Sequence, residues 1–108
     1  MEECTFFDDL NNFAKTKNNN IRNEYGTHMP YLFYDKENNK KLLFDVKINN
    51  VWKLHIYDFA SREIKQVKTP TSKTEEMNEC NPNIYIDNKK NYILSYVAAP
   101  DRFRLSRN

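Results

Sequence analysis

The chain has 108 residues, of which 30% are charged and 14% are aromatic, and its formal net charge is +2. This length suggests a single domain spanning 1–108. The small net charge disfavours the nucleic-acid binders that depend on a strong basic signal. The single glycine, Gly26, excludes glycine-rich phosphate loops and dinucleotide-binding turns.

The sequence begins with acidic residues and lacks the apolar stretch of a signal peptide, and it contains no apolar run of membrane-spanning length. We therefore expect a cytoplasmic protein without a membrane contact, in which Cys4 and Cys80 stay as thiols. His28 and His55 lie far apart in the sequence, and neither cysteine has the C-x-x-C spacing of a metal site. We expect no metal, no cofactor and no catalytic residue.

Residues 5–16 are predicted to form the one helix, because apolar side chains recur there at spacings of three and four. The members of this apolar face are Phe6, Leu10, Phe13 and Ala14. A polar linker is predicted over 17–28, and this N-terminal part has no counterpart elsewhere in the chain.

A first β unit is predicted over 30–69, because the hydrophobic period there changes to two. Its strands are expected at about 30–35, 41–48, 51–58 and 63–68. Asn38–Asn39 and Asn49–Asn50 separate strands and suit tight turns, since asparagine tolerates a left-handed backbone. His55 alternates with Trp52 and Leu54, so we expect it on the surface or rim of the sheet.

A polar connection, 70–81, leads to a second β unit over 82–107. Its strands are expected at about 83–87, 91–98 and 102–107. The predicted fold is therefore mainly β (α+β), an antiparallel meander of about seven strands with one N-terminal helix.

The second β unit repeats the first at an offset of roughly 50 residues, a period typical of repeated β units. Pro30-Tyr-Leu-Phe-Tyr-Asp35 is echoed by Pro82-Asn-Ile-Tyr-Ile-Asp87, and Leu42 to Ile48 by Tyr92 to Ala98. Trp52-Lys-Leu54 is echoed in the same way by Phe103-Arg-Leu105. Asp35 and Asp87 recur at strand ends, where we expect them to cap turns with their own carboxylates.

The segment Asn81-Pro82-Asn-Ile-Tyr-Ile-Asp87, followed by the aromatic strand from Asn91 to Tyr96, resembles a blade of five-bladed glycosidases and related sugar-binding propellers. This resemblance covers about 30–69 and 82–107, and it implies an alternative fold of two propeller-like blades completed by oligomerisation. In the glycosidases an aspartate before the proline supplies a catalytic carboxylate. Here Met29 and Asn81 occupy the matching positions, so the resemblance implies binding rather than catalysis.

The aromatic residues of the strands are the candidate binding residues, because several strands look apolar on both faces. Either both faces are covered, one of them by the helix, or one face is a binding surface. The candidates are Tyr31, Phe33, Trp52, Tyr85 and Tyr96, together with Arg102 and Arg104 on the last predicted strand.

These observations predict a non-catalytic protein–protein interaction module that binds another protein or further copies of itself. The excess of Asn, Lys, Ile and Tyr is typical of an A+T-rich genome, so a small inhibitor or assembly factor encoded by a phage or bacterium is expected. Two alternatives stay open. One is a degenerate carbohydrate-binding module of the propeller type, and the other is a single-stranded nucleic-acid binder that uses Arg102, Arg104 and Arg107.

Overall fold

The computed structural model describes residues 2–17, 30–48 and 50–100. Within these residues one helix precedes six strands. The elements are α1 (Glu2–Thr16), β1 (Tyr31–Tyr34), β2 (Lys40–Ile48), β3 (Val51–Asp58), β4 (Ile64–Gln66), β5 (Asn78–Ile86) and β6 (Tyr92–Ala99).

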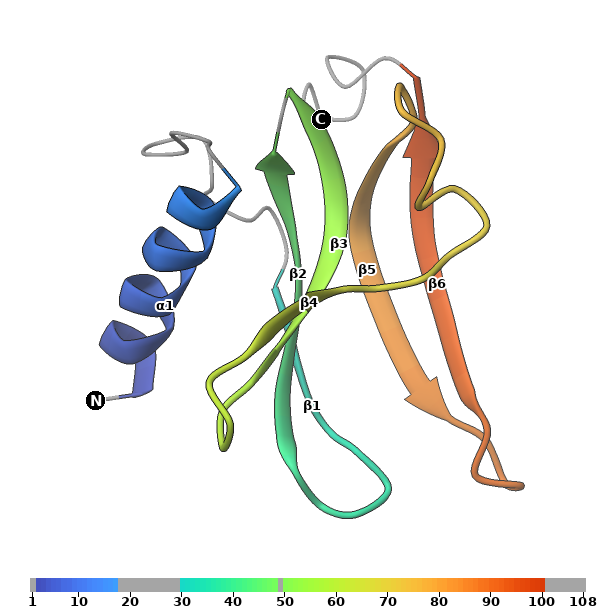
Figure 1. Cartoon of the computed structure of the whole chain (residues 1–108). Helices are drawn as coiled ribbons and strands as arrows, with labels where there is room; N and C mark the ends of the chain where they lie inside the picture. Colours follow the sequence, from blue (N-terminus) through green and yellow to red (C-terminus); the bar gives the residue numbers. More distant parts are fainter. Residues whose placement is uncertain (1, 18–29, 49, 101–108) are drawn as a thin grey trace.

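The strands form two antiparallel sheets, one with the order β1-β2-β3-β4 and one consisting of β5 and β6. Figure 1 shows α1 on one side of the four-stranded sheet and the β5–β6 sheet on the other side. The mainly β, antiparallel fold with one helix is thereby confirmed. The predicted strand at 102–107 lies outside the described residues, and the two-blade alternative stays a prediction.

The helix packs its predicted apolar face on the four-stranded sheet. Phe6, Leu10 and Ala14 are buried against a cluster that includes Phe44 of β2 and Tyr57 of β3. The ring centroid of Phe6 lies 5.1 Å from the centroids of both aromatic rings, in edge-on geometry. The helix begins at Glu2 rather than at residue 5, so the predicted start was wrong by one turn, which is the usual uncertainty of a helix end.

The opposite face of the four-stranded sheet is also buried, because β5 packs against β2 and β3. Leu43 and Leu54 are fully buried, and Trp52 is almost so. Both faces of the central strands β2 and β3 are therefore covered, one of them by the helix, whereas Leu32 and Tyr34 of β1 are about half exposed.

The second β unit begins earlier than predicted. β5 starts at Asn78, so the predicted polar connection 70–81 and the unit boundary at 82 were wrong. The polar sequence hid this strand, because Asn78 and Glu79 are buried together with Cys80. The strand is irregular near Asn81, whose φ of 54° falls in the left-handed region and whose neighbours shift the register.

The two hairpins have the same strand register. Tyr31 pairs with Leu43 in the first hairpin, and Asn83 pairs with Ser95 in the second. Both members of the first pair are displaced by 52 residues in the second pair, so the two hairpins repeat in structure. The predicted match of Leu42 with Tyr92 was wrong by two residues, because this register matches Leu42 with Leu94. The predicted match of Trp52 with Phe103 lies outside the described residues.

The two hairpin turns are also alike. In the first, the Asp35 carboxylate accepts hydrogen bonds from the backbone N–H groups of Glu37 and Asn39, at 2.9 and 2.8 Å. Asn38 between them has a φ of 66°. These bonds hold the pKa of the Asp35 carboxyl below its ordinary value, with the Asn39 N–H as the largest cause.

In the second turn, the Asp87 carboxylate accepts from the N–H groups of Lys89 and Asn91, at 2.8 and 2.9 Å. Lys90 has a φ of 67°, and the pKa of Asp87 is again lowered, chiefly by the Asn91 N–H. The predicted capping role of both aspartates is confirmed.

Candidate interaction surface

One face of the β5–β6 sheet is turned toward the rest of the molecule. The hydroxyl of Tyr92 accepts a hydrogen bond from the backbone N–H of Lys36 in the first hairpin, at 2.7 Å. The hydroxyl of Tyr96 lies 2.9 Å from the hydroxyl of Thr71. Because side chains alternate along a strand, Ile93, Ser95 and Val97 of β6 belong to the opposite face.

This opposite face is called the outer face below, and it consists of Asn83, Tyr85, Ile93, Ser95 and Val97. Tyr85 pairs directly with Ile93, and Asn83 with Ser95. Tyr85 is 55% exposed and Val97 is 44% exposed. The outer face is therefore an apolar stripe with two small polar side chains. Cys80, which pairs with Val97, lies on the same side of the sheet but is only 1% exposed, so this side is open at Tyr85 and Val97 and covered at Cys80.

The predicted binding residues differ in their location and burial. Tyr85 lies on the outer face as expected. Trp52 is only 4% exposed, so its assignment to a binding surface was wrong, because β5 covers its side of β3. The pairing of Tyr31 with Leu43 and of Phe33 with Lys41 places both aromatic residues on the side of β5, where they are half-buried.

The remaining predicted binding residues do not belong to the outer face as described. Tyr96 is half-buried and bonded to Thr71. Arg102 and Arg104 lie outside the described residues. Sequence reasoning missed Val97, although its spacing of two residues from the polar Ser95 on a predicted strand places both on one face and could have indicated it.

His55 is buried, which corrects the expectation that it lies on the surface or rim. Its ring lies under α1, with its centroid 5.5 Å from that of Phe13. Nδ1 lies 3.0 Å from the carbonyl oxygen of Lys53, so the neutral ring donates there. Burial lowers the pKa of His55 to about 4. The prediction failed because the sequence does not show which side of the sheet the helix covers.

A polar cluster fastens α1 to the sheet. The Asp9 carboxylate accepts hydrogen bonds from the Tyr57 hydroxyl at 2.6 Å and from the Arg62 guanidinium at 2.8 and 3.0 Å. The guanidinium holds the pKa of the Asp9 carboxyl below its usual range. Burial, together with the bond to Asp9, raises the pKa of Tyr57 to about 12. All three groups act in helix docking.

A second polar cluster joins the two sheets. One oxygen of the buried Glu79 carboxylate accepts from the backbone N–H of Leu54 at 3.1 Å, and the other accepts from the hydroxyls of Thr69 and Thr71. Beside it, the Asn78 side-chain oxygen accepts from the backbone N–H of Trp52 at 3.0 Å. These side chains bind the part of β3 that extends beyond its pairing with β4.

The buried ammonium of Lys53 holds the connection between the sheets. It donates to the carbonyl oxygens of Thr71, Thr74 and Met77 at 2.7, 2.9 and 2.7 Å. Since a buried charge is costly unless it is hydrogen-bonded, these three acceptors are what make its burial tolerable. The role of Lys53 is therefore structural.

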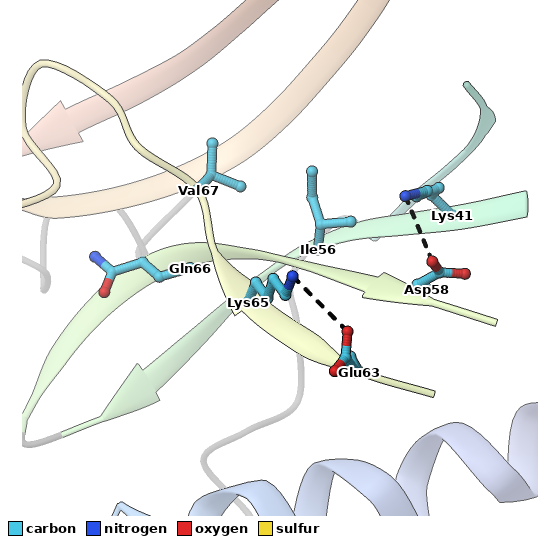
Figure 2. A pocket seen from close by; sticks show the side chains of 7 residues that line it. All are labelled: Lys41, Ile56, Asp58, Glu63, Lys65, Gln66 and Val67. Atoms are coloured by element: carbon cyan, nitrogen blue, oxygen red, sulfur yellow. Dashed lines mark ion pairs between the residues drawn. The ribbon is translucent and has the colours of Figure 1, made fainter. Parts of the chain in front are cut away.

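The hollows of the surface are lined by ion pairs and aliphatic groups. One hollow, of about 210 Å³, lies beside β3 and β4 (Figure 2). On its rim the ammonium of Lys41 lies 3.5 Å from the carboxylate of Asp58, and that of Lys65 lies 3.7 Å from the carboxylate of Glu63. Burial alone would raise the pKa of Asp58, but the Ala60 N–H and Lys41 bring it below its ordinary value. A larger hollow of about 820 Å³ lies between the end of α1 and β3–β4, and it has lysine and glutamate on its rim.

Two further searches concern only the described residues. No group of three His, Cys, Asp or Glu side chains lies close enough together there to hold a metal ion. No helix in that part of the chain is long and apolar enough to cross a membrane.

The chain matches no known family model, no curated protein and no solved structure. The case for a function therefore depends on the geometry of its surfaces.

Proposed function

We propose that this chain is a non-catalytic protein-binding module and that the outer face of the β5–β6 sheet is its docking surface. The observation that carries this proposal is the contrast between the two sheets. The central strands β2 and β3 of the four-stranded sheet are covered on both faces, whereas the outer face leaves Tyr85 and Val97 about half exposed. An apolar stripe of this kind on a folded domain is typical of an interaction site.

The composition of the outer face suits a protein partner. Tyr85 offers a large, rigid ring with a polar tip, the kind of side chain that often dominates binding energy at interfaces. Ile93 and Val97 extend the apolar area along β6, and Asn83 and Ser95 supply small hydrogen-bonding groups among them. Apolar contact with a few polar groups is the usual composition of a protein interface.

The nature of the partner is the finer part of the proposal. A second protein that the chain inhibits or helps to assemble is the partner we favour, inside the cell that makes it. A homo-oligomer through the same face is the variant of this proposal that a mass measurement in solution would reveal.

The test uses the full chain as bait in an extract of the cells that make it. We expect a partner retained by the wild-type chain to be lost with Tyr85→Asp and with Val97→Asp, because each places a charge in the apolar stripe. Leu32→Asp is the matched control, since Leu32 is 48% exposed but belongs to β1 of the other sheet.

Retention of the partner by Tyr85→Asp and Val97→Asp, or its equal loss with Leu32→Asp, would contradict the proposal. Loss of the captured material after nuclease treatment would point instead to the nucleic-acid alternative. Thermal unfolding of each variant shows whether a loss of binding has another cause, because substitutions at exposed positions should leave stability almost unchanged.

A further inference from the structure

The outward edge of β6 is a strand edge without the usual protection. β6 runs over eight residues, Tyr92–Ala99, and within the described part of the chain it pairs only with β5. Folded proteins commonly protect such edges with charged residues, proline or short strands. The segment Tyr92–Ala99 contains no charged residue and no proline, so its edge is suited to receive another strand.

The first hairpin shows how the equivalent edge is filled. β2 pairs with β1 in the same register in which β6 pairs with β5, so the two strands correspond. The other edge of β2 is occupied by β3, antiparallel, from the pair Lys41 and Asp58 to the pair Ile48 and Val51. The edge of β6 therefore has the geometry of an edge that this same chain fills with an antiparallel strand.

The direction of the backbone groups agrees with this comparison. The N–H of Asp87 donates to the carbonyl oxygen of Asn91 at 3.0 Å, so Asn91 faces β5. Because bonding alternates along an antiparallel ladder, the backbone groups of Tyr92 and Leu94 point away from β5. In the first hairpin the carbonyl oxygen of Lys40, which matches Tyr92, accepts from the N–H of Phe59 beyond the end of β3, at 3.3 Å.

Charge distinguishes one end of this edge from the other. The ammonium of Lys36 lies 5.0 Å from the centre of the Tyr92 ring, and Lys89 and Lys90 are exposed in the turn before β6. An antiparallel strand would end beside these lysines with its C-terminal residues. In the first hairpin the C-terminal residue of β3 is Asp58, which pairs with Lys41 at 3.5 Å.

We propose that the outward edge of β6 binds an extended segment of a partner protein, antiparallel to β6, with alternating apolar side chains and an acidic residue at its C-terminal end. Main-chain hydrogen bonds to Tyr92 and Leu94 supply the ladder, as in other strand-addition complexes. This inference rests on the proposed function, since it names the shape and charge of the partner of a protein-binding module.

The test begins with amide hydrogen exchange of the full chain alone. The N–H groups of Tyr92 and Leu94 should exchange fast and that of Ile93 slowly, because only Ile93 points toward β5. Leu42 of β2, which matches Leu94, is the internal control, and its N–H should exchange slowly because β2 has a strand on each side.

The probe is a synthetic peptide with the sequence of β3, Val-Trp-Lys-Leu-His-Ile-Tyr-Asp. We expect it to slow exchange at Tyr92 and Leu94 by roughly tenfold or more. A peptide of the same sequence with alternate amides N-methylated should have no effect, and one ending in Lys in place of Asp should bind more weakly.

Two results would overturn the inference. One is slow exchange at Tyr92 and Leu94 in the chain alone, which would mean that this chain or a second copy already fills the edge; a mass measurement then identifies which. The other is fast exchange that the peptide leaves unchanged. If either occurs while Tyr85→Asp still abolishes partner capture, the edge inference fails and the proposed function stands.

Discussion

The two hairpins of this chain have the same turn and the same register, yet they stand in different surroundings. The β1–β2 hairpin belongs to a sheet that α1 covers on one face and β5 on the other. The β5–β6 hairpin has one face against that sheet and an outer face with Tyr85 and Val97 about half exposed. The same local pattern therefore serves as core in one place and as surface in the other.

The difference shows that the repeated sequence determines the turns and the register of each hairpin but not which of its faces is buried. The capped turns at Asp35 and Asp87 depend on residues a few positions away, so they survive repetition. Burial depends on which element packs on a strand, and the first hairpin is followed in the chain by β3 and β4, of which β3 pairs with β2. The predictions below test this separation.

The largest contrast is expected from removing one aromatic ring in each hairpin. Phe44→Ala should lower the free energy of unfolding by about 3–5 kcal/mol, because Phe44 is fully buried against α1. Tyr85→Ala should change it by no more than about 0.5 kcal/mol. Urea unfolding measures both, and similar losses for the two variants would show that the outer face is covered in solution.

The next largest loss of stability is expected from the polar cluster around Glu79, which joins the two sheets. Glu79→Ala leaves the N–H of Leu54 and two threonine hydroxyls without their buried acceptor, which should cost about 2–3 kcal/mol. Glu76→Ala is the control, because Glu76 is exposed. An equal effect of the two substitutions in urea unfolding would contradict the structural role of Glu79.

A pH dependence of similar or smaller size is expected from His55 in the covered sheet. Its folded-state pKa is about 4 against an ordinary value of 6.5, so below pH 6.5 the unfolded chain binds a proton that the folded chain does not. Stability should fall by about 2 kcal/mol between about pH 7 and about pH 5.

Urea unfolding at the two pH values measures this loss, and His55→Gln should remove most of it. Lys17, which disfavours the imidazolium, and Glu79, which favours it, are the charged groups that act on the ring. A loss of the same size in His55→Gln would assign the pH dependence to other groups.

The smallest difference in stability is expected between substitutions in the two hairpin turns. Asp35→Ala and Asp87→Ala should each lower the melting temperature, since each removes an acceptor of two backbone N–H groups. Asp35→Ala should lower it slightly more, because Asp35 also lies 3.6 Å from the ammonium of Lys41. A much larger effect at Asp87 would show that the two turns are not equivalent.

The strands of the first unit could be predicted from the sequence because alternation of apolar and polar side chains is a local signal. The position of β5 could not be predicted, since Asn78 and Glu79 look like loop residues until the N–H groups that they bind are known. The predictions for Trp52 and His55 were wrong for a related reason. The period of a strand shows that its two faces differ, but it does not show which element packs on each face.

The bonds from Asn78 and Glu79 to β3 also explain why β5 does not continue the first sheet beside β3. A strand added beside β3 would have to bond to the N–H groups of Trp52 and Leu54, and two side chains already take these positions. Growth of the first sheet by lateral addition is thereby stopped at that point of β3. The β5–β6 hairpin instead packs on the first sheet as a separate layer.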